Sequence, residues 1–138
     1  MPEKETLERA EQDKREGKSP STQAGEFVRE EIHHIREGKH GAASSKQAIA
    51  IGLSKARRAG VDLPAPKKGA ASEKTRKSAE RDSSRGHSNK KKTVSAKRSR
   101  SSERALKREP RSAASHTALS RHAKRAARTR KKASRRAA

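Results

Sequence analysis

Large apolar side chains are scarce in this chain, and their placement limits what it can fold into. Only 14 of the 138 residues are Val, Ile, Leu, Met or Phe, and 11 of these lie within residues 1–64. The remainder cannot bury enough apolar surface to offset the conformational entropy lost on folding. We expect a mostly α-helical chain with large disorder, in which a short helical head precedes a basic tail.

The charge is distributed as unevenly as the apolar residues. The whole chain has 38 Lys and Arg residues against 16 Asp and Glu residues, a formal net charge of +22. Residues 1–64 contain 12 basic and 11 acidic residues, whereas residues 65–138 contain 26 and 5. A one-signed excess of this size favours nucleic acid as the partner over a small-molecule substrate. We expect DNA more than RNA, because recognition of RNA through stacked bases lacks an aromatic platform when Phe27 is in the core.

The sequence also indicates a compartment. It contains no Cys, which excludes disulfide bonds and thiolate chemistry. Its first residues are rich in acids and lack the apolar run of a signal peptide, and no later segment is apolar over the length needed to cross a bilayer. We therefore expect a cytoplasmic protein, located at the nucleoid, with no membrane partner.

Helices are expected throughout the head. Residues 1–18 contain strong helix formers but few apolar positions, so they predict a solvated helix. Residues 21–37 have apolar positions along one side, which predicts an amphipathic helix that ends at Gly38. Either Ser19 or Ser21 is suited to cap the start of this helix.

A further helix is predicted by a capping-box pattern, in which Ser44 is followed three residues later by Gln47. This helix should end at Gly60, and Gly52 in its middle is best explained by close approach of another helix. Together with the preceding helix it forms the expected small helical hairpin domain of residues 19–64. An antiparallel hairpin and a helix-turn-helix both fit this pattern.

The third helix also suggests self-association. Ala48, Gly52 and Ala56 form a face with little side-chain bulk, and Ile51 points away from it. Either a homodimer through the head or the segment of residues 61–63 folding back would cover Ile51.

The composition changes after Pro64. Residues 65–111 are dominated by Lys, Arg and Ser, which predicts a disordered basic linker. Residues 112–138 are rich in Ala, Lys and Arg and lack Gly and Pro, so this basic tail has the potential to be helical after Ser112. Repulsion between its like charges should keep the helix partial until anions neutralise them.

No enzyme active site, cofactor site or metal site is expected. His33 and His34 are adjacent and point about 100° apart on a helix, so they cannot chelate one ion together. The other four His residues have no ligand-type neighbour at a chelating spacing. The acids Glu30, Glu31 and Glu37 are predicted to lie on a solvated helix face. No phosphate-binding Gly-rich loop is present, and nothing places a base beside a nucleophilic Ser.

Basic residues of the tail are the candidate nucleic-acid contacts. Each phosphate that Lys or Arg neutralises releases condensed counterions, so a flexible basic chain binds a duplex without precise geometry. The candidate contacts are Lys90, Lys91, Lys92, Lys97, Arg98, Arg100, Arg121, Lys124, Arg125, Arg128, Arg130, Lys131, Lys132, Arg135 and Arg136.

A base-reading helix-turn-helix is the alternative within the head. Its second helix would place a set of polar and small side chains in the major groove. The residues that share one side of the third predicted helix are Lys46, Gln47, Ala50, Ser54 and Arg57. Two-helix elements are more often ordinary packing units, so this interpretation is weaker than the charge argument.

Residues 45–60, which read Ser-Lys-Gln-Ala-Ile-Ala-Ile-Gly-Leu-Ser-Lys-Ala-Arg-Arg-Ala-Gly, carry a family resemblance. They resemble the Lys-Gln-Ala-Ile-Ala-Ile helix motif of a small basic bacterial family of unknown function. Residues 19–28 are similar to the longer members of that family, which carry Lys, Arg and Ala tails. The resemblance implies a bacterial cytosolic protein with a histone H1-like tail, and it implies no established activity or site.

Taken together, these features predict a non-sequence-specific DNA-binding, nucleoid-associated, histone-like protein that acts by phosphate neutralisation. An RNA- or ribosome-associated basic protein is the alternative among binding proteins. A disordered hydrophilic stress protein is the alternative from another class. That role fits the low hydropathy but does not require charge of one sign.

Overall fold

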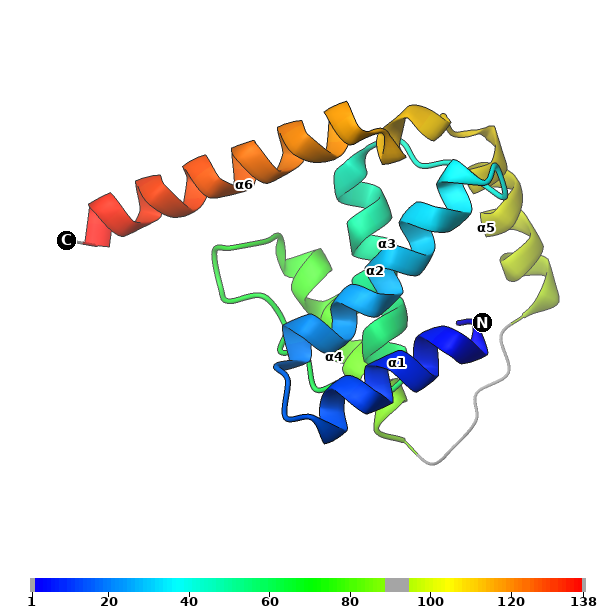
Figure 1. Ribbon diagram of the computed structural model, residues 1–138, viewed down its shortest axis with the longest axis horizontal. Coiled ribbons are helices and arrows are strands. Elements are labelled where there is room, and N and C mark those ends of the chain that lie inside the picture. The colour runs from blue at the N-terminus through cyan, green and yellow to red at the C-terminus, as the bar shows by residue number, and fades with distance from the viewer. Residues whose placement is uncertain (1, 89–94, 138) are drawn as a thin grey trace.

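The computed structural model describes residues 2–88 and 95–137, which form a stack of helices with one long helix projecting from it (Figure 1). The described residues contain no strand, and their one isolated β-bridge joins Lys68 to Ala71. The mostly helical class is therefore confirmed. The helices are α1 (Lys4–Arg15), α2 (Pro20–Arg36), α3 (Ser45–Arg58), α4 (Glu73–Gly86), α5 (Ala96–Arg108), the short 3-10 helix η1 (Arg111–Ala114) and α6 (His116–Ala137).

Ser19, and not Ser21, caps the start of α2. The Ser19 hydroxyl accepts a hydrogen bond from the Thr22 backbone N–H at 3.3 Å, and Pro20 occupies the first turn, where its missing N–H costs nothing. The helix ends at Gly38, whose φ of 80° is a left-handed conformation that glycine adopts without strain.

The predicted capping box at α3 is confirmed in a slightly displaced form. The Ser44 hydroxyl accepts the Gln47 N–H at 3.2 Å, and the Gln47 side chain accepts a bond from Ala43, one residue before the cap, at 2.7 Å. The first bond satisfies a backbone donor in the first turn of α3, and the second satisfies the N–H of Ala43 just before the cap.

The small residues of α3 face α2 of the same chain. A Cβ built on Gly52 would lie 2.6 Å from the Cα of Val28, so the two backbones are in close approach at this point. Ala48 and Ala56, one turn to either side, have no exposed surface. The two helices therefore pack directly against each other. The suggestion that this face is left open for a second copy is wrong, because α2 already covers it.

Two apolar clusters hold the stack together. The first cluster surrounds Phe27, which is buried between α1, α2, α3 and the segment after α3. The buried members of this cluster are Ala10, Ala24, Phe27, Ala56 and Val61. α1 lies against α2 through one buried side that includes Thr6 and Asp13, so it is not the fully solvated helix expected from its composition.

The second cluster joins the head to a segment from the basic half of the chain. Ala113 and Ala114 of η1 are buried against Ile35, Ala42 and Ala48. The backbone takes part as well. The connector between α2 and α3 donates hydrogen bonds from Gly41 to the Leu106 carbonyl at 2.8 Å and from Ala42 to the Pro110 carbonyl at 3.1 Å. Residues 1–64 therefore do not contain the whole core.

The prediction of disorder across residues 65–111 is not supported, because α4 and α5 lie in this segment. Ser72 caps α4 by accepting the Thr75 N–H at 3.2 Å, and Ala79 is buried. On α4, Asp82 accepts a hydrogen bond from Ser54 of α3 at 2.6 Å. The composition of this segment does not reveal the docking, because α4 docks through one small apolar residue, Ala79, and through polar contacts such as those of Asp82 with Ser54 and Arg58.

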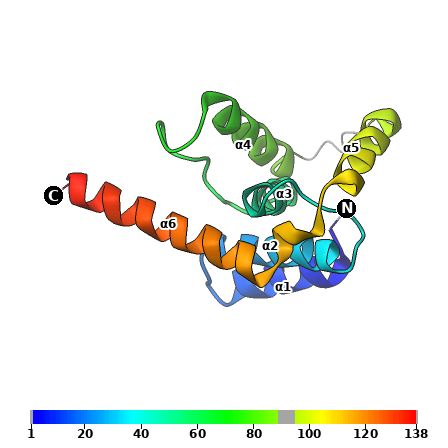
Figure 2. The same ribbon diagram turned by 90° about the horizontal axis from the view of Figure 1, so that it is seen from above.

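Figure 2 shows α3 between α4 on one side and α2 and α1 on the other. Ile51 lies three residues before Ser54, on the side of α3 that contacts α4. It is half-buried there, so the structure accounts for Ile51 without a second chain.

Candidate nucleic-acid interface

Among the helices of the described chain, α6 carries the largest net charge. It carries nine Lys and Arg residues and no acidic residue, and none of its described residues is buried. Ser115 caps its start by accepting the Ala118 N–H at 3.1 Å, and Arg135 and Arg136 lie in its last turn, where cations interact favourably with the helix dipole. The potential for helix after Ser112 is therefore realised.

The cations of α6 gather on one side of the helix. At 100° per residue, seven of the nine fall within an arc of about 120°, and they extend over about 22 Å of helix axis. This basic stripe consists of Arg121, Lys124, Arg125, Arg128, Lys132, Arg135 and Arg136. The remaining two cations, Arg130 and Lys131, lie outside the arc.

The rest of the molecule leaves the basic stripe open. α6 contacts the stack only near its start, where Leu119, His122 and Ala126 are half-buried, and its far end projects beyond the other helices (Figures 1 and 2). Within the described residues, no ion pair involves a residue of α6. The last ion pair in chain order joins Lys107 to Glu103, both on α5. In residues 2–88 and 95–137, no carboxylate is therefore placed to neutralise the stripe.

The other candidate contacts fall in two places. Lys97, Arg98 and Arg100 lie on α5, whose described side chains are all exposed or half-exposed. Lys90, Lys91 and Lys92 lie outside the described residues.

Two of the five side chains in the base-reading alternative are held by contacts within the protein and are not free to contact bases. Arg57 is only 8% exposed and donates to the Pro64 carbonyl at 3.0 Å, and burial lowers its pKa. Ser54 is occupied by Asp82 of α4. Since α4 covers this side of α3, the helix-turn-helix footprint is not available as a unit to enter a groove.

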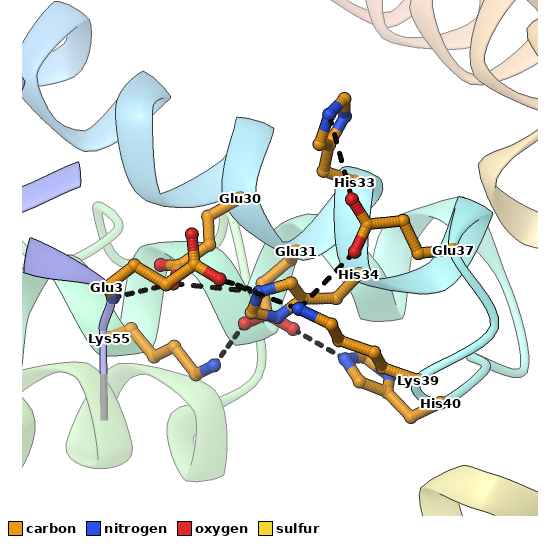
Figure 3. A network of polar contacts seen from close by, with 9 residues as sticks. All are labelled: Glu3, Glu30, Glu31, His33, His34, Glu37, Lys39, His40 and Lys55. Atoms are coloured by element: carbon orange, nitrogen blue, oxygen red, sulfur yellow. Dashed lines mark hydrogen bonds and ion pairs between the residues drawn. The ribbon is translucent and has the colours of Figure 1, made fainter. Parts of the chain in front are cut away.

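A cluster of buried charged side chains lies on α2, where it meets Glu3 at the start of α1 and Lys55 of α3 (Figure 3). The side chains of Glu30 and Glu31 are 2% and 1% exposed, which contradicts the expectation that they lie on a solvated face. Glu31 is held by an ion pair with Lys55 of α3, and Glu30 accepts the backbone N–H of Glu3 at 2.7 Å.

Side chains at the exposed edge of the cluster also form ion pairs and hydrogen bonds. His34 lies 3.0 Å from a Glu3 carboxylate oxygen, and this hydrogen bond lowers the pKa of Glu3. Lys39 pairs with Glu37 at 3.3 Å, which raises the pKa of Lys39. His33 points elsewhere, toward Glu37, as expected for two adjacent histidines on a helix (Figure 3).

One signal in the sequence marks this cluster. Glu31 lies four residues after Phe27 and four before Ile35, so it occupies the middle of the apolar side of α2. A carboxylate at that position requires a partner from another element. That partner is Lys55, which lies 24 residues away along the chain, so its identity was not visible from spacing.

The family of unknown function DUF6496 matches residues 13–68, which include α2 and α3. No curated protein matches the chain. No solved structure matches it either. None of the helices in the described ranges is long and apolar enough to cross a membrane.

Proposed function

We propose that this protein binds DNA without sequence preference and acts as a nucleoid-associated, histone-like protein. The single observation that carries the proposal is the basic stripe of α6, in which seven cations share one side of an exposed helix that contains no acid. The candidate contacts on α5 and the lysines at positions 90–92 would add to the electrostatic attraction for DNA.

The stripe suits a phosphate backbone for a physical reason. Its seven positive charges extend over about 22 Å of helix axis. Duplex DNA presents one negative charge per about 1.7 Å of its axis, so phosphates are available along the whole length of the stripe. A helix lying along or in a groove would bring several cations to phosphates together. Each contact releases counterions, which supplies affinity without reading the bases.

DNA is favoured over RNA because of helix dimensions. The major groove of B-form DNA is about 12 Å wide and admits an α-helix, whereas that of A-form RNA is deep and narrow. Stacking on single-stranded bases requires exposed aromatic rings, and the only Phe, Tyr or Trp in the chain, Phe27, is 1% exposed. A ribosome- or RNA-associated role remains the alternative outcome of the test.

The bacterial origin and the nucleoid location belong to the same proposal. The match to a family of unknown function is compatible with the resemblance carried by residues 45–60, and the histone H1-like composition of the tail supports a role in DNA compaction. A stress protein that acts by remaining disordered is disfavoured, since helices account for most of the described residues. A homodimer stays a prediction, which sedimentation of the full chain across a wide concentration range tests.

The test is to identify the nucleic acid that the full chain binds. The protein is purified in moderate salt, and any nucleic acid that copurifies is digested separately with DNase and with RNase. We expect DNase-sensitive material of mixed sequence. Material sensitive only to RNase would favour the ribosome-associated alternative, and failure to bind added duplex DNA at low salt would overturn the proposal.

A further inference from the structure

A cluster of metal-ligand side chains lies where α2 meets the connector to α3 (Figure 3). One ligand atom from each of Glu31, His34 and His40 lies within 4.8 Å of the other two. Their side chains are 1%, 15% and 13% exposed, so the group is almost enclosed. Two imidazoles and one carboxylate are a donor set that Zn²⁺ and related ions bind in proteins.

The carboxylate of Glu31 has one oxygen without a hydrogen bond. Its Oε1 is paired with the Lys55 ammonium group. Its Oε2 is buried and accepts no hydrogen bond in the described part of the chain, although the Nε2 atom of His40 lies 3.1 Å away. An enclosed carboxylate oxygen in this state is costly unless a cation reaches it.

The orientation of His40 fixes which of its nitrogens is free. Its Nδ1 lies 2.9 Å from the Gly41 carbonyl oxygen, which can only accept, so Nδ1 carries the hydrogen. In the neutral ring, Nε2 then presents a lone pair to the Oε2 of Glu31. Histidines that ligate metals commonly donate their second N–H to a carbonyl in this way.

We propose that Glu31, His34 and His40 bind one divalent transition-metal ion of the Zn²⁺ class. The ion places a positive charge between two acceptors that would otherwise repel each other, and Lys55 holds the carboxylate in position from its other oxygen. The site is structural, because it ties His40 of the connector to α2. Gly41 and Ala42 follow directly and bond to the Leu106 and Pro110 carbonyls, so the ion braces the surface on which residues 106–114 dock.

The first test titrates the metal-stripped full chain with Zn²⁺ and, as a coloured probe, with Co²⁺. We expect saturation at one ion per chain, with a visible Co²⁺ absorption band typical of low coordination number. The ring NMR signals of His34 and His40 should shift, while those of His33 stay in place. Absence of a saturable single site, or an equal effect on His33, would overturn the proposal in favour of a protonated His40 paired with Glu31.

The second test compares two histidine variants. His40→Gln should weaken Zn²⁺ binding by more than about tenfold. His33→Gln is the matched control, because His33 is adjacent to His34 on α2 but 69% exposed, and it should bind like the wild type. Equal binding by both variants contradicts the assignment. Circular dichroism checks that each variant is folded. If His40→Gln is unfolded, the titration of the wild type decides whether the site exists.

Discussion

Gly52 of α3 packs directly on the backbone of Val28 in α2: a Cβ at position 52 would lie 2.6 Å from the Val28 Cα and 2.9 Å from its backbone nitrogen. Neither atom is the end of a flexible side chain, so the helices would have to separate. We expect Gly52→Ala to destabilise the fold by about 1–3 kcal/mol in urea denaturation, despite the higher helix propensity of alanine.

Gly25 provides the matched control for this substitution. It also lies within a helix, but a Cβ there meets nothing within 4 Å. Gly25→Ala should therefore stabilise the protein by up to about 1 kcal/mol. If both alanine variants were stabilised, the close contact of α2 and α3 would be wrong.

The cap of α2 gives a second matched pair. Ser19 accepts the Thr22 N–H, whereas Ser21 lies exposed within the first turn. We expect Ser19→Ala to cost about 1 kcal/mol of unfolding free energy and Ser21→Ala to cost almost nothing. The reverse order in denaturant titrations would place the start of the helix two residues later.

Docking of η1 on the head can be tested through backbone amides. Ala114 is fully buried in the second cluster, so Ala114→Glu forces a carboxylate into an apolar site and should undock residues 106–114. The amides of Gly41 and Ala42, which bond to this segment, should then lose hydrogen-exchange protection. Ser112→Glu, on the exposed side of the same turn, should leave both protected. Unchanged protection in Ala114→Glu would contradict the docking.

A pH dependence is expected at the end of α4. The Ser83 carbonyl and then the Asp62 carboxylate, 2.8 and 2.5 Å from the two ring nitrogens, raise the pKa of His87 above its ordinary value of 6.5, although burial and Lys14 act weakly in the other direction. A raised pKa in the folded state means that the protonated form is stabilised by folding. This contribution is fully present below about pH 6.5 and is lost as the pH rises through the folded pKa.

The measurement is an NMR titration of the His87 ring together with amide exchange in α4 from pH 6 upward. Asp62→Asn should bring the pKa of His87 closer to 6.5 and flatten the pH profile of exchange. An unchanged titration midpoint in Asp62→Asn would show that this ion pair does not form in solution.

Local signals in the sequence predicted α2 and α3 well. The Ser44 and Gln47 pair, the glycines after each helix and the apolar spacing on α2 are each determined by contacts within a few residues. These features do not depend on the rest of the fold, so spacing alone reveals them.

The contacts that sequence reasoning missed depend on small or charged side chains. Ala113 and Ala114 enter the core without the bulk that marks a core residue, and α4 docks through Ala79 and Asp82. Composition predicts that Glu31 lies in solvent, because charged residues are seldom buried, but its position on the apolar side of α2 argues for the buried site that the structure has. Pairings of this kind are set by tertiary structure and not by local pattern.

The central claim is that the stripe on α6, and not net charge alone, binds the phosphate backbone. It is tested with two full-length variants that each replace four exposed cations by Gln and so have the same net charge. The α6 variant carries Arg121→Gln, Lys124→Gln, Arg125→Gln and Arg128→Gln, and the α4 control carries Lys74→Gln, Lys77→Gln, Arg81→Gln and Arg85→Gln.

The deciding measurement is the affinity of both variants and the wild type for mixed-sequence duplex DNA over a range of salt concentrations. If all four α6 cations contact phosphates, the slope of log K against log salt should become shallower by about 3 to 4 in the α6 variant. The α4 variant should keep nearly the wild-type slope. Equal slopes for the two variants would contradict the account, because binding would then follow net charge and not the placement of cations on α6.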